Sequence, residues 1–436
     1  MNYIGTMIAM CLICLVILMT VLCNVYTIKF LIVLCFFQNI LLVLISPFIS
    51  KIDFYLIILS KEVLVLFTIV WYCIRCLRLK KGQIYSFIGI FIMFVLLLVY
   101  GSKNAKASMT SFRQLIIPFE FFLFGQVFNL SKKDVNSIIV LYIKLCVFAC
   151  LFGYVELVIG DRFWEYLGIQ KYTMLKYGQI VKIKGVYCWG NMYTTDLVPI
   201  FGIIIKRMCS ILVDPVILSQ LLAVALIFVL FYKDLSFGQL RKKIYIFVLL
   251  SGLIMTYGKG GLLIFLGAVL YICYFKKTEY RKWIGLVGAF GVCCSFMLIL
   301  YSPKGSSINS HVTGLTDYLN IIWEKPFGGG IGTEGNLAAH YGEMTSGSGE
   351  SFVGTLIGQL GIIGIIIYVL FIGYILKKMR KKDIFNVIMS GLIIMVMITS
   401  LLNNTAISFT NCFIYFILAG IRMDCNDCKI ECLNSK

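Results

Sequence analysis

Residues 351–376 read SFVGTLIGQLGIIGIIIYVLFIGYIL, and the basic cluster KKMRKK follows at 377–382. An uncharged apolar run of about 20 or more residues is long enough to cross the hydrocarbon core of a bilayer as a helix. Lys and Arg gather on the cytoplasmic side of membrane proteins, so the cluster that ends the run marks that side. The stretch therefore predicts a membrane-spanning helix that begins outside the cell and ends inside it.

The composition of the whole chain also indicates a membrane fold. Of its 436 residues 60% are hydrophobic and 14% are charged, and a soluble core cannot bury so much apolar surface. The formal charge of +19 comes mostly from short basic clusters between apolar runs, which argues against a nucleic-acid partner. We expect a single integral membrane domain over residues 1–436, in contact with membrane lipid.

Apolar runs of similar length recur along the chain and predict an all-α bundle of 12 or 13 spans. The predicted helices cover about 4–23, 30–49, 54–73, 83–100, 112–128, 135–156, 214–232, 244–257, 260–275, 284–301, 351–376, 384–402 and 405–421. Lys61 and Glu62 interrupt one run, so that segment is either an ordinary span or a re-entrant one.

Basic residues lie in alternate turns between the predicted helices, and this pattern predicts the topology. The turns hold Arg75, Arg78, Lys80 and Lys81; Lys132 and Lys133; Arg241, Lys242 and Lys243; Lys276, Lys277, Arg281 and Lys282; and residues 377–382. One register then places two long polar loops, 157–213 and 302–350, outside the cell and the tail 422–436 in the cytoplasm.

The first outer loop ends in KRMCSILVDP at 206–215. Asp214 as N-cap and Pro215 at the first helical position predict the start of a helix, which explains Asp214 without catalysis. Arg207 lies just before this span, where a guanidinium could bind a diphosphate in bidentate fashion. The alternative is an ordinary solvated charge.

Two more cations are predicted on the outer side. Lys259 lies in the turn TYGKGG at 256–261, and Arg113 lies near the start of another span. Either could contact an anionic substrate; for Lys259 the alternative is that its side chain only reaches out to the membrane surface.

The second outer loop contains WEKPFGGGIGT at 323–333. Leu315, Tyr318, Leu319 and Ile322 precede it at helical spacing and predict a short amphipathic interfacial helix, with Trp323 as its anchor and Pro326 as its end. Glycines at 328, 329, 330 and 332 allow a close backbone approach, so Gly329, Gly330 and Gly332 are candidate ligands of a phosphate or sugar. A flexible turn is the alternative.

Several residues of the second loop could serve as a general base. Glu350 is predicted in the first turn of the next helix, where the helix dipole favours a carboxylate, and a carboxylate at a membrane–water boundary can accept a proton. Glu334, Glu343 and His340 compete for this role, and His340 and His311 are the chain's two histidines.

The sequence lacks the motifs of nucleotide and metal enzymes. Neither GxxxxGK[ST], HExxH, GxSxG nor a DxD-type acidic pair occurs in a loop, so we expect no cofactor and no metal. Cys425, Cys428 and Cys432 form a CxxCxxxC run in the tail, but no fourth zinc ligand follows them.

In their order, these segments resemble the O-antigen ligase and polysaccharide polymerase superfamily of bacterial envelope proteins. The resemblance covers about residues 110–400. It rests on Arg207 before Asp214-Pro215, on Lys259 in a turn where the family usually has Arg, on the segment Trp323 to Gly332, and on Glu350-Ser351 before a glycine-rich apolar helix. Ligases of this group typically carry a His where this chain has Glu350, which favours a polymerase.

The resemblance implies a bundle of the membrane glycosyltransferase C type in the bacterial plasma membrane. It also implies metal-independent transfer of a glycan from undecaprenyl diphosphate to a sugar hydroxyl, in O-antigen, capsule or exopolysaccharide synthesis. Arg207, Lys259 and Arg113 would stabilise the leaving diphosphate. A flippase and a chain-length regulator of the same pathway would be the protein partners.

Three other classes of function compete. A non-catalytic membrane scaffold gives no reason for cations beside the outer turns. An O-antigen-type ligase would pass the glycan to a different acceptor. A lipid-linked oligosaccharide flippase or other transporter should show repeated halves and charges facing a mid-membrane cavity. No repeat is visible, and the candidate intramembrane charges lie in the first half of the chain: Lys61, Glu62, Glu120, Lys144 and Glu156.

Overall fold

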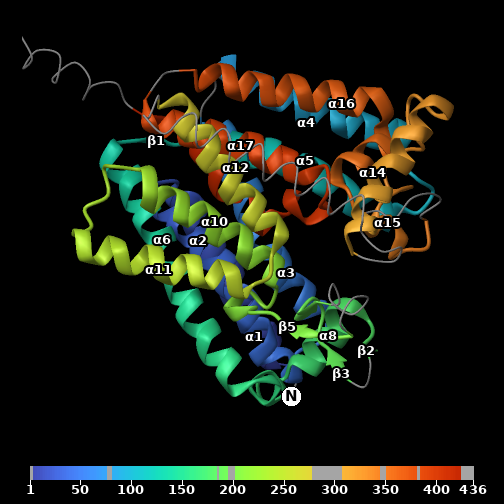
Figure 1. Ribbon diagram of the computed structural model, residues 1–436. Coiled ribbons are helices and arrows are strands. Elements are labelled where there is room, and N and C mark those ends of the chain that lie inside the picture. Colours follow the sequence, from blue (N-terminus) through green and yellow to red (C-terminus); the bar gives the residue numbers. More distant parts are fainter. Residues whose placement is uncertain are drawn as a thin grey trace, which may run out of the picture.

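The computed structural model describes residues 3–75, 81–183, 186–194, 202–276, 307–343, 350–380 and 383–423. These residues form a bundle of helices that lie side by side (Figure 1). The helices are α1 (Tyr3–Leu22), α2 (Val25–Ile45), α3 (Lys51–Arg75), α4 (Lys81–Tyr100), α5 (Ala105–Val127), α6 (Lys132–Ile159), α7 (Asp161–Leu167), α8 (Ile169–Tyr177), α10 (Pro215–Phe231), α11 (Gln239–Met255), α12 (Lys259–Phe275), α14 (Ser307–Glu324), α15 (Asn336–Ala339), α16 (Phe352–Lys378), α17 (Ile384–Ser400) and α18 (Phe409–Gly420).

Short elements complete the described part of the chain. Three 3₁₀ helices are η1 (Ser46–Phe48), η2 (Ser210–Leu212) and η3 (Asn404–Ile407). Strand β1 (Asn129–Leu130) pairs in parallel with β6 (Arg422–Met423), and two antiparallel pairs join β2 (Val181–Ile183) to β3 (Val186–Cys188) and β4 (Tyr193–Thr194) to β5 (Ile205–Lys206).

The all-α membrane fold expected from the sequence is confirmed at this level. Within the described residues, six helices are long and apolar enough to cross a membrane: α1, α2, α3, α4, α6 and α16. Four shorter apolar helices accompany them: α10, α12, α17 and α18. Helix α3 runs unbroken through Lys61 and Glu62, so this segment is an ordinary helix and not a re-entrant one. The predicted span 284–301 lies outside the described residues.

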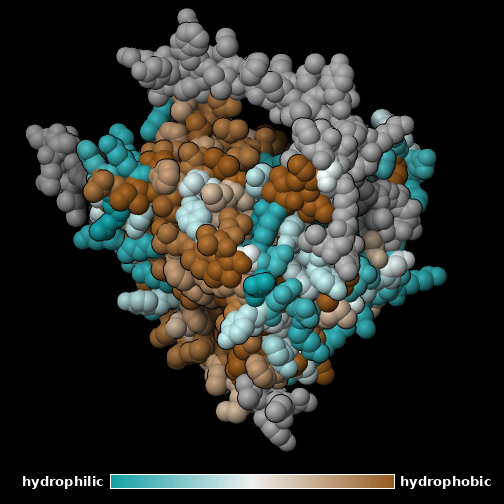
Figure 2. All heavy atoms as spheres, turned by 60° about the horizontal axis from the view of Figure 1, so that its bottom comes forward, coloured by the Kyte–Doolittle hydropathy of each residue, from teal (hydrophilic) through white to brown (hydrophobic). Residues whose placement is uncertain are grey.

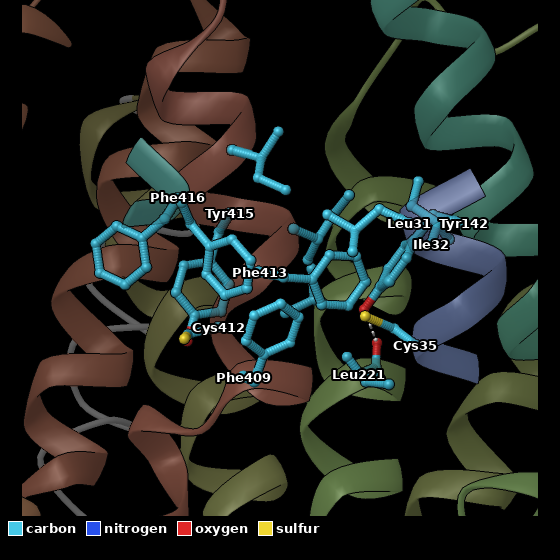
Figure 3. Close-up of a cluster of buried hydrophobic side chains, with 14 of the residues drawn as sticks. Leu31, Ile32, Cys35, Tyr142, Leu221, Phe409, Cys412, Phe413, Tyr415 and Phe416 are labelled. Atoms are coloured by element: carbon cyan, nitrogen blue, oxygen red, sulfur yellow. Dashed lines mark hydrogen bonds between the residues drawn. The ribbon is translucent and has the colours of Figure 1, made fainter. Parts of the chain in front are cut away.

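The core is closed by helices that approach each other at small residues. A Cβ atom on Gly125 of α5 would lie 2.2 Å from the carbonyl oxygen of Ile417 in α18, and one on Gly420 would lie 2.2 Å from that of Phe122. Such glycines let two membrane helices pack backbone to backbone. Beside this contact, aromatic and aliphatic side chains of α2, α6, α10 and α18 meet (Figure 3), where the Tyr142 hydroxyl donates to the Leu221 carbonyl at 2.9 Å.

One end of the bundle gathers several of the basic turns. Lys132 Nζ lies 3.0 Å from Asp234 Oδ2, which joins the start of α6 to the turn after α10. Lys378 Nζ donates to the carbonyl of Ala419 at 3.0 Å and joins the end of α16 to the end of α18. The β1–β6 pair lies at the same end.

The described parts of the two long loops lie at the other end. Figure 1 shows α8, β2, β3 and β5 of the first loop and α14 and α15 of the second at the side of the bundle away from β1. Figure 2 shows a broad hydrophobic surface over the middle of the bundle, with hydrophilic side chains toward both ends. The two loops therefore converge where the bundle meets a polar environment.

Candidate functional site

A cavity of about 290 Å³ opens at the end of the bundle that carries the loops. We call it the cationic cavity. Its lining comes from the first loop, the α11–α12 turn, the second loop and the connection between α17 and α18. The lining residues are Asn191, Arg207, Val216, Tyr257, Gly258, Lys259, Gly260, Asn336, Glu350, Asn403, Asn404 and Thr405.

Backbone hydrogen bonds fasten Arg207 beside the α11–α12 turn. Its N–H donates to the carbonyl of Met192 at 2.8 Å, next to the β4–β5 pair, and the N–H of Met208 donates to the carbonyl of Met255 at 3.0 Å. The guanidinium Nε of Arg207 donates to the carbonyl of Thr256 at 2.9 Å. The first loop thus holds Arg207 against the end of α11, three residues before Lys259.

Glu156 of α6 holds the first loop next to Arg207. It lies near the end of α6 and is fully buried. Its carboxylate accepts the indole N–H of Trp164 at 2.9 Å and the backbone N–H groups of Cys209 at 3.2 Å and Ser210 at 2.6 Å. The sequence suggested an intramembrane charge; the structure gives this carboxylate the role of an anchor for the loop that carries Arg207.

The helix start predicted at Asp214 is confirmed. Asp214 is the N-cap of α10 and its carboxylate accepts the N–H groups of Val216 at 2.8 Å and Ile217 at 3.2 Å, with Pro215 in the first position. This local job accounts for Asp214, as expected from the sequence.

Lys259 is the first residue of α12, and the N-terminus of this helix faces the cationic cavity. The N-cap is Gly258, which provides no side-chain cap, and Gly258, Lys259 and Gly260 all line the cavity. The first amides of a helix together with its dipole attract anions. A Cβ on Gly258 would lie 2.2 Å from Cβ of Ser219, so the glycine allows α12 to begin directly against α10.

Glu350 lies two residues before the first residue of α16, the helix in whose first turn it was predicted. The N-cap of α16 is Ser351, whose hydroxyl accepts the N–H of Gly354 at 2.8 Å, so Glu350 precedes the first turn and the dipole argument is corrected. The Glu350 carbonyl accepts the N–H of Asn404 at 2.7 Å, which ties it to η3. Glu350 nevertheless lines the same cavity as Arg207 and Lys259.

Amide side chains that the sequence analysis assigned no role surround these charges. The cationic cavity is lined by Asn191, Asn336, Asn403 and Asn404, and by Thr405. Carboxamides offer both donors and acceptors, as sugar hydroxyls require. The signal was visible in the sequence, because three of the five are consecutive polar residues between two apolar helices.

A second cavity of about 240 Å³ adjoins the first, and Asn336, Asn404 and Thr405 line both. Its other lining residues are Glu62, Thr110, Arg113, Gln114, Ile117, Leu337, Ile407, Ser408 and Phe409. The structure therefore places Arg113 next to the cationic cavity and not in it. Its Nε lies 3.3 Å from Oε2 of Glu62.

The competing bases of the second loop lie elsewhere. Glu334 is only 3% exposed and accepts a hydrogen bond from the Tyr318 hydroxyl at 3.3 Å; burial, and then the Glu334 carboxylate, raise the pKa of this tyrosine. His340 is exposed at the end of α15, and Glu343 is half-buried beyond it. None of these three predicted bases lines either cavity. The side chain of His311 lies outside the described residues.

The glycine-rich segment of the second loop completes the backbone hydrogen bonds of a broken helix. Helix α16 is interrupted at Gly361, where φ is 56° and ψ is −140°. The N–H groups of Gly329 and Gly330 donate to the carbonyls of Gly358 and Gln359 at 2.7 and 2.9 Å. Peptide groups released by a break in a buried helix need such partners.

The same segment also contacts the junction of α4 and α5. The N–H of Ile331 donates to the Tyr100 carbonyl at 2.8 Å, and a Cβ on Gly332, where φ is 89°, would lie 2.5 Å from the backbone nitrogen of Ser108. The predicted ligands Gly329, Gly330 and Gly332 thus lie between α16 and α5, outside both cavities. Helix α14 begins earlier than predicted, at Ser307, and ends before Pro326 as expected.

Comparison of the chain with known protein families, curated proteins and solved structures finds no match. Among the described residues, no group of three or more His, Cys, Asp and Glu side chains lies close enough to hold a metal ion. The function is therefore inferred from the two cavities and from the sequence.

Proposed function

We propose that this chain is a polysaccharide polymerase of the bacterial plasma membrane. It would join undecaprenyl-diphosphate-linked oligosaccharide repeat units at the outer face, as a metal-independent glycosyltransferase. The observation that carries the proposal is the meeting of Arg207, Lys259 and Glu350 in one cavity, from three segments far apart in the sequence.

The cations of the cavity suit a lipid diphosphate as the leaving group. When the bond between the anomeric carbon and the diphosphate oxygen breaks, the oxygen keeps the electron pair and negative charge builds on the diphosphate. Arg207, held by its hydrogen bond to Thr256, and Lys259, the first residue of α12, would stabilise this charge together with the helix N-terminus. A planar guanidinium binds two phosphate oxygens at once.

Glu350 suits the role of general base. The acceptor hydroxyl attacks the anomeric carbon as its proton passes to the carboxylate, and the new glycosidic bond replaces the bond to the diphosphate. Holding the two glycans in register would supply part of the rate enhancement. The asparagines and Thr405 of the lining would bind the sugar hydroxyls beside the reacting atoms.

The departure from the ligase pattern at Glu350 favours a polymerase over a ligase, and reconstitution separates the two. Purified protein in lipid nanodiscs, given only lipid-linked repeat units, should produce a ladder of longer glycans. A product that forms only when a separate acceptor is added would assign the chain to the ligases.

A deletion strain separates both enzymes from a transporter. A strain without a polymerase should still export single repeat units but lose long polymer. Accumulation of lipid-linked units inside the cell would instead assign the chain to the flippases.

A further inference from the structure

The second cavity contains an ion pair at its wall. Glu62 of α3 is 8% exposed and its carboxylate oxygen lies 3.3 Å from Nε of Arg113, whose side chain is 44% exposed. Ionisable groups on membrane helices are costly unless they are paired or functional. The pair leaves the cavity with one positive and one negative group, so it offers hydrogen-bond donors and acceptors without the net positive charge that an anion needs.

Most of the surface of this cavity is apolar, and a few polar groups interrupt it. Ile117, Leu337, Ile407 and Phe409 line the cavity together with the amide Gln114, among other polar residues. Sugar rings present hydroxyls at their edges and C–H groups on their faces, and sites of this mixed kind fix a ligand by a few placed polar groups on apolar walls.

The shared wall is fixed in orientation. Gln114 Nε2 donates to Oδ1 of Asn404 at 2.9 Å and to its carbonyl at 3.2 Å. Asn336, from the one-turn helix α15, lines both cavities as Asn404 does. The two cavities are therefore neighbours that meet at Asn336, Asn404 and Thr405.

We infer that the second cavity is a saccharide subsite, which binds a neutral sugar of the glycan whose end reacts in the cationic cavity. Glu62 and Arg113 are its charged hydrogen-bonding pair, and Leu337 and Phe409 give its apolar walls. This assignment rests on the proposed function, since it names where the sugars of the same substrate lie.

Two probes test the two cavities separately by equilibrium binding to purified full-length protein in nanodiscs. One is the free oligosaccharide, released by mild acid from the lipid-linked repeat units of the organism that encodes the chain. The other is undecaprenyl diphosphate without sugar. Leu337→Trp narrows only the second cavity, and Val216→Trp, also at a half-buried position, narrows only the cationic one.

The expected result is a crossed pattern. Glu62→Gln should weaken binding of the free oligosaccharide by about 10- to 100-fold, as expected for the loss of hydrogen bonds to a charged group. Leu337→Trp should weaken it by filling the cavity, and both variants should leave undecaprenyl diphosphate binding unchanged. Val216→Trp should weaken undecaprenyl diphosphate binding instead. Leu337 is a half-buried residue of the one-turn helix α15, outside the bundle core, so its variant stays informative if Glu62→Gln fails to fold.

Two results would overturn the assignment. One is undiminished binding of the oligosaccharide by folded Leu337→Trp protein; the other is no binding of the oligosaccharide by the unaltered protein. Either could occur while the unaltered protein still makes a ladder, which would spare the proposed polymerase. If the unaltered protein makes no ladder and does not bind undecaprenyl diphosphate, the proposed function itself is contradicted.

Discussion

The two cavities share three lining residues and differ in how their charges are matched. Among the described lining residues of the cationic cavity, Arg207, Lys259 and the N-terminus of α12 are positive and Glu350 is the one carboxylate. In the second cavity Glu62 and Arg113 offset each other. Two arginines that look alike in the sequence thus lie in different surroundings: Arg207 lies with Lys259 at one cavity, and Arg113 lies against Glu62 at the other.

We expect both cavities to open on the outer side of the membrane, and labelling tests this topology with an all-or-none effect. In a cysteine-free background, an impermeant thiol reagent should label Tyr166→Cys in intact cells and spare Arg380→Cys. Tyr166 is 91% exposed in helix α7 of the first loop, and Arg380 is exposed at the end with the basic turns. Labelling of position 380 without position 166 would reverse the topology.

The next largest effect concerns the base. Glu350→Gln should slow ladder formation by about 100- to 10,000-fold, the usual range for a general base. Glu343→Gln is the matched control, because its carboxylate lies in the same loop and lines neither cavity. A normal ladder from Glu350→Gln protein would transfer the role to another group.

Charge stabilisation by the cationic cavity should have a somewhat smaller effect. Arg207→Ala should reduce the rate by about 100- to 1000-fold, as loss of one positioned donor does, and Arg207→Lys should lose less. Lys259→Arg should be tolerated, since the charge at the start of α12 remains. Chains of near-normal length in cells with matched amounts of Arg207→Ala protein would remove this residue from the mechanism.

The ion pair of the second cavity should reveal itself in stability. Arg113→Ala removes the ion-pair partner of Glu62 and should lower the free energy of unfolding. Because Arg113 is partly exposed, the decrease should be smaller than the about 3 to 5 kcal/mol expected when a fully buried pair is broken. Replacing both residues by Gln should restore much of the thermal stability in detergent. If the double variant melts no higher than Arg113→Ala, the pair contributes nothing measurable.

The smallest expected effect is at the helix that supports the cationic cavity. Asp214→Ala removes the N-cap of α10 and should cost about 1 kcal/mol of stability, while Asp214→Asn keeps the cap and should cost less. Thermal unfolding of the purified variants measures both. Equal melting temperatures for Asp214→Ala and the unaltered protein would contradict the capping role.

The helices and the charged residues of the cationic cavity could be predicted from the sequence because their causes are local. Apolar runs fixed the helices, and the Asp214-Pro215 pair fixed the start of α10 to the residue. Arg207, Lys259 and Glu350 are predicted site residues because they lie beside the predicted outer turns, and the fold brings them to one cavity. A position at a helix end on a given side of a membrane is a local property.

The remaining parts of the site depend on partners that no local pattern specifies. Nothing in the sequence pairs Arg113 with Glu62, since they belong to different helices. The spacing of the glycines showed that close approach was needed, but not that Gly358 and Gln359 would be the groups approached. The asparagines can be recognised as site residues only in the structure, where the first loop, the second loop and the α17–α18 connection meet around the cationic cavity.

The break at Gly361 ties the second loop to α16. Lifting residues 326–332 would strand the peptide groups of α16 that this segment now pairs, so the segment is held in place. The residues that follow are held as well, because the Gln359 side chain donates to the carbonyl of Glu334. A helix that is broken at one glycine thereby supplies the support from which Asn336 reaches both cavities.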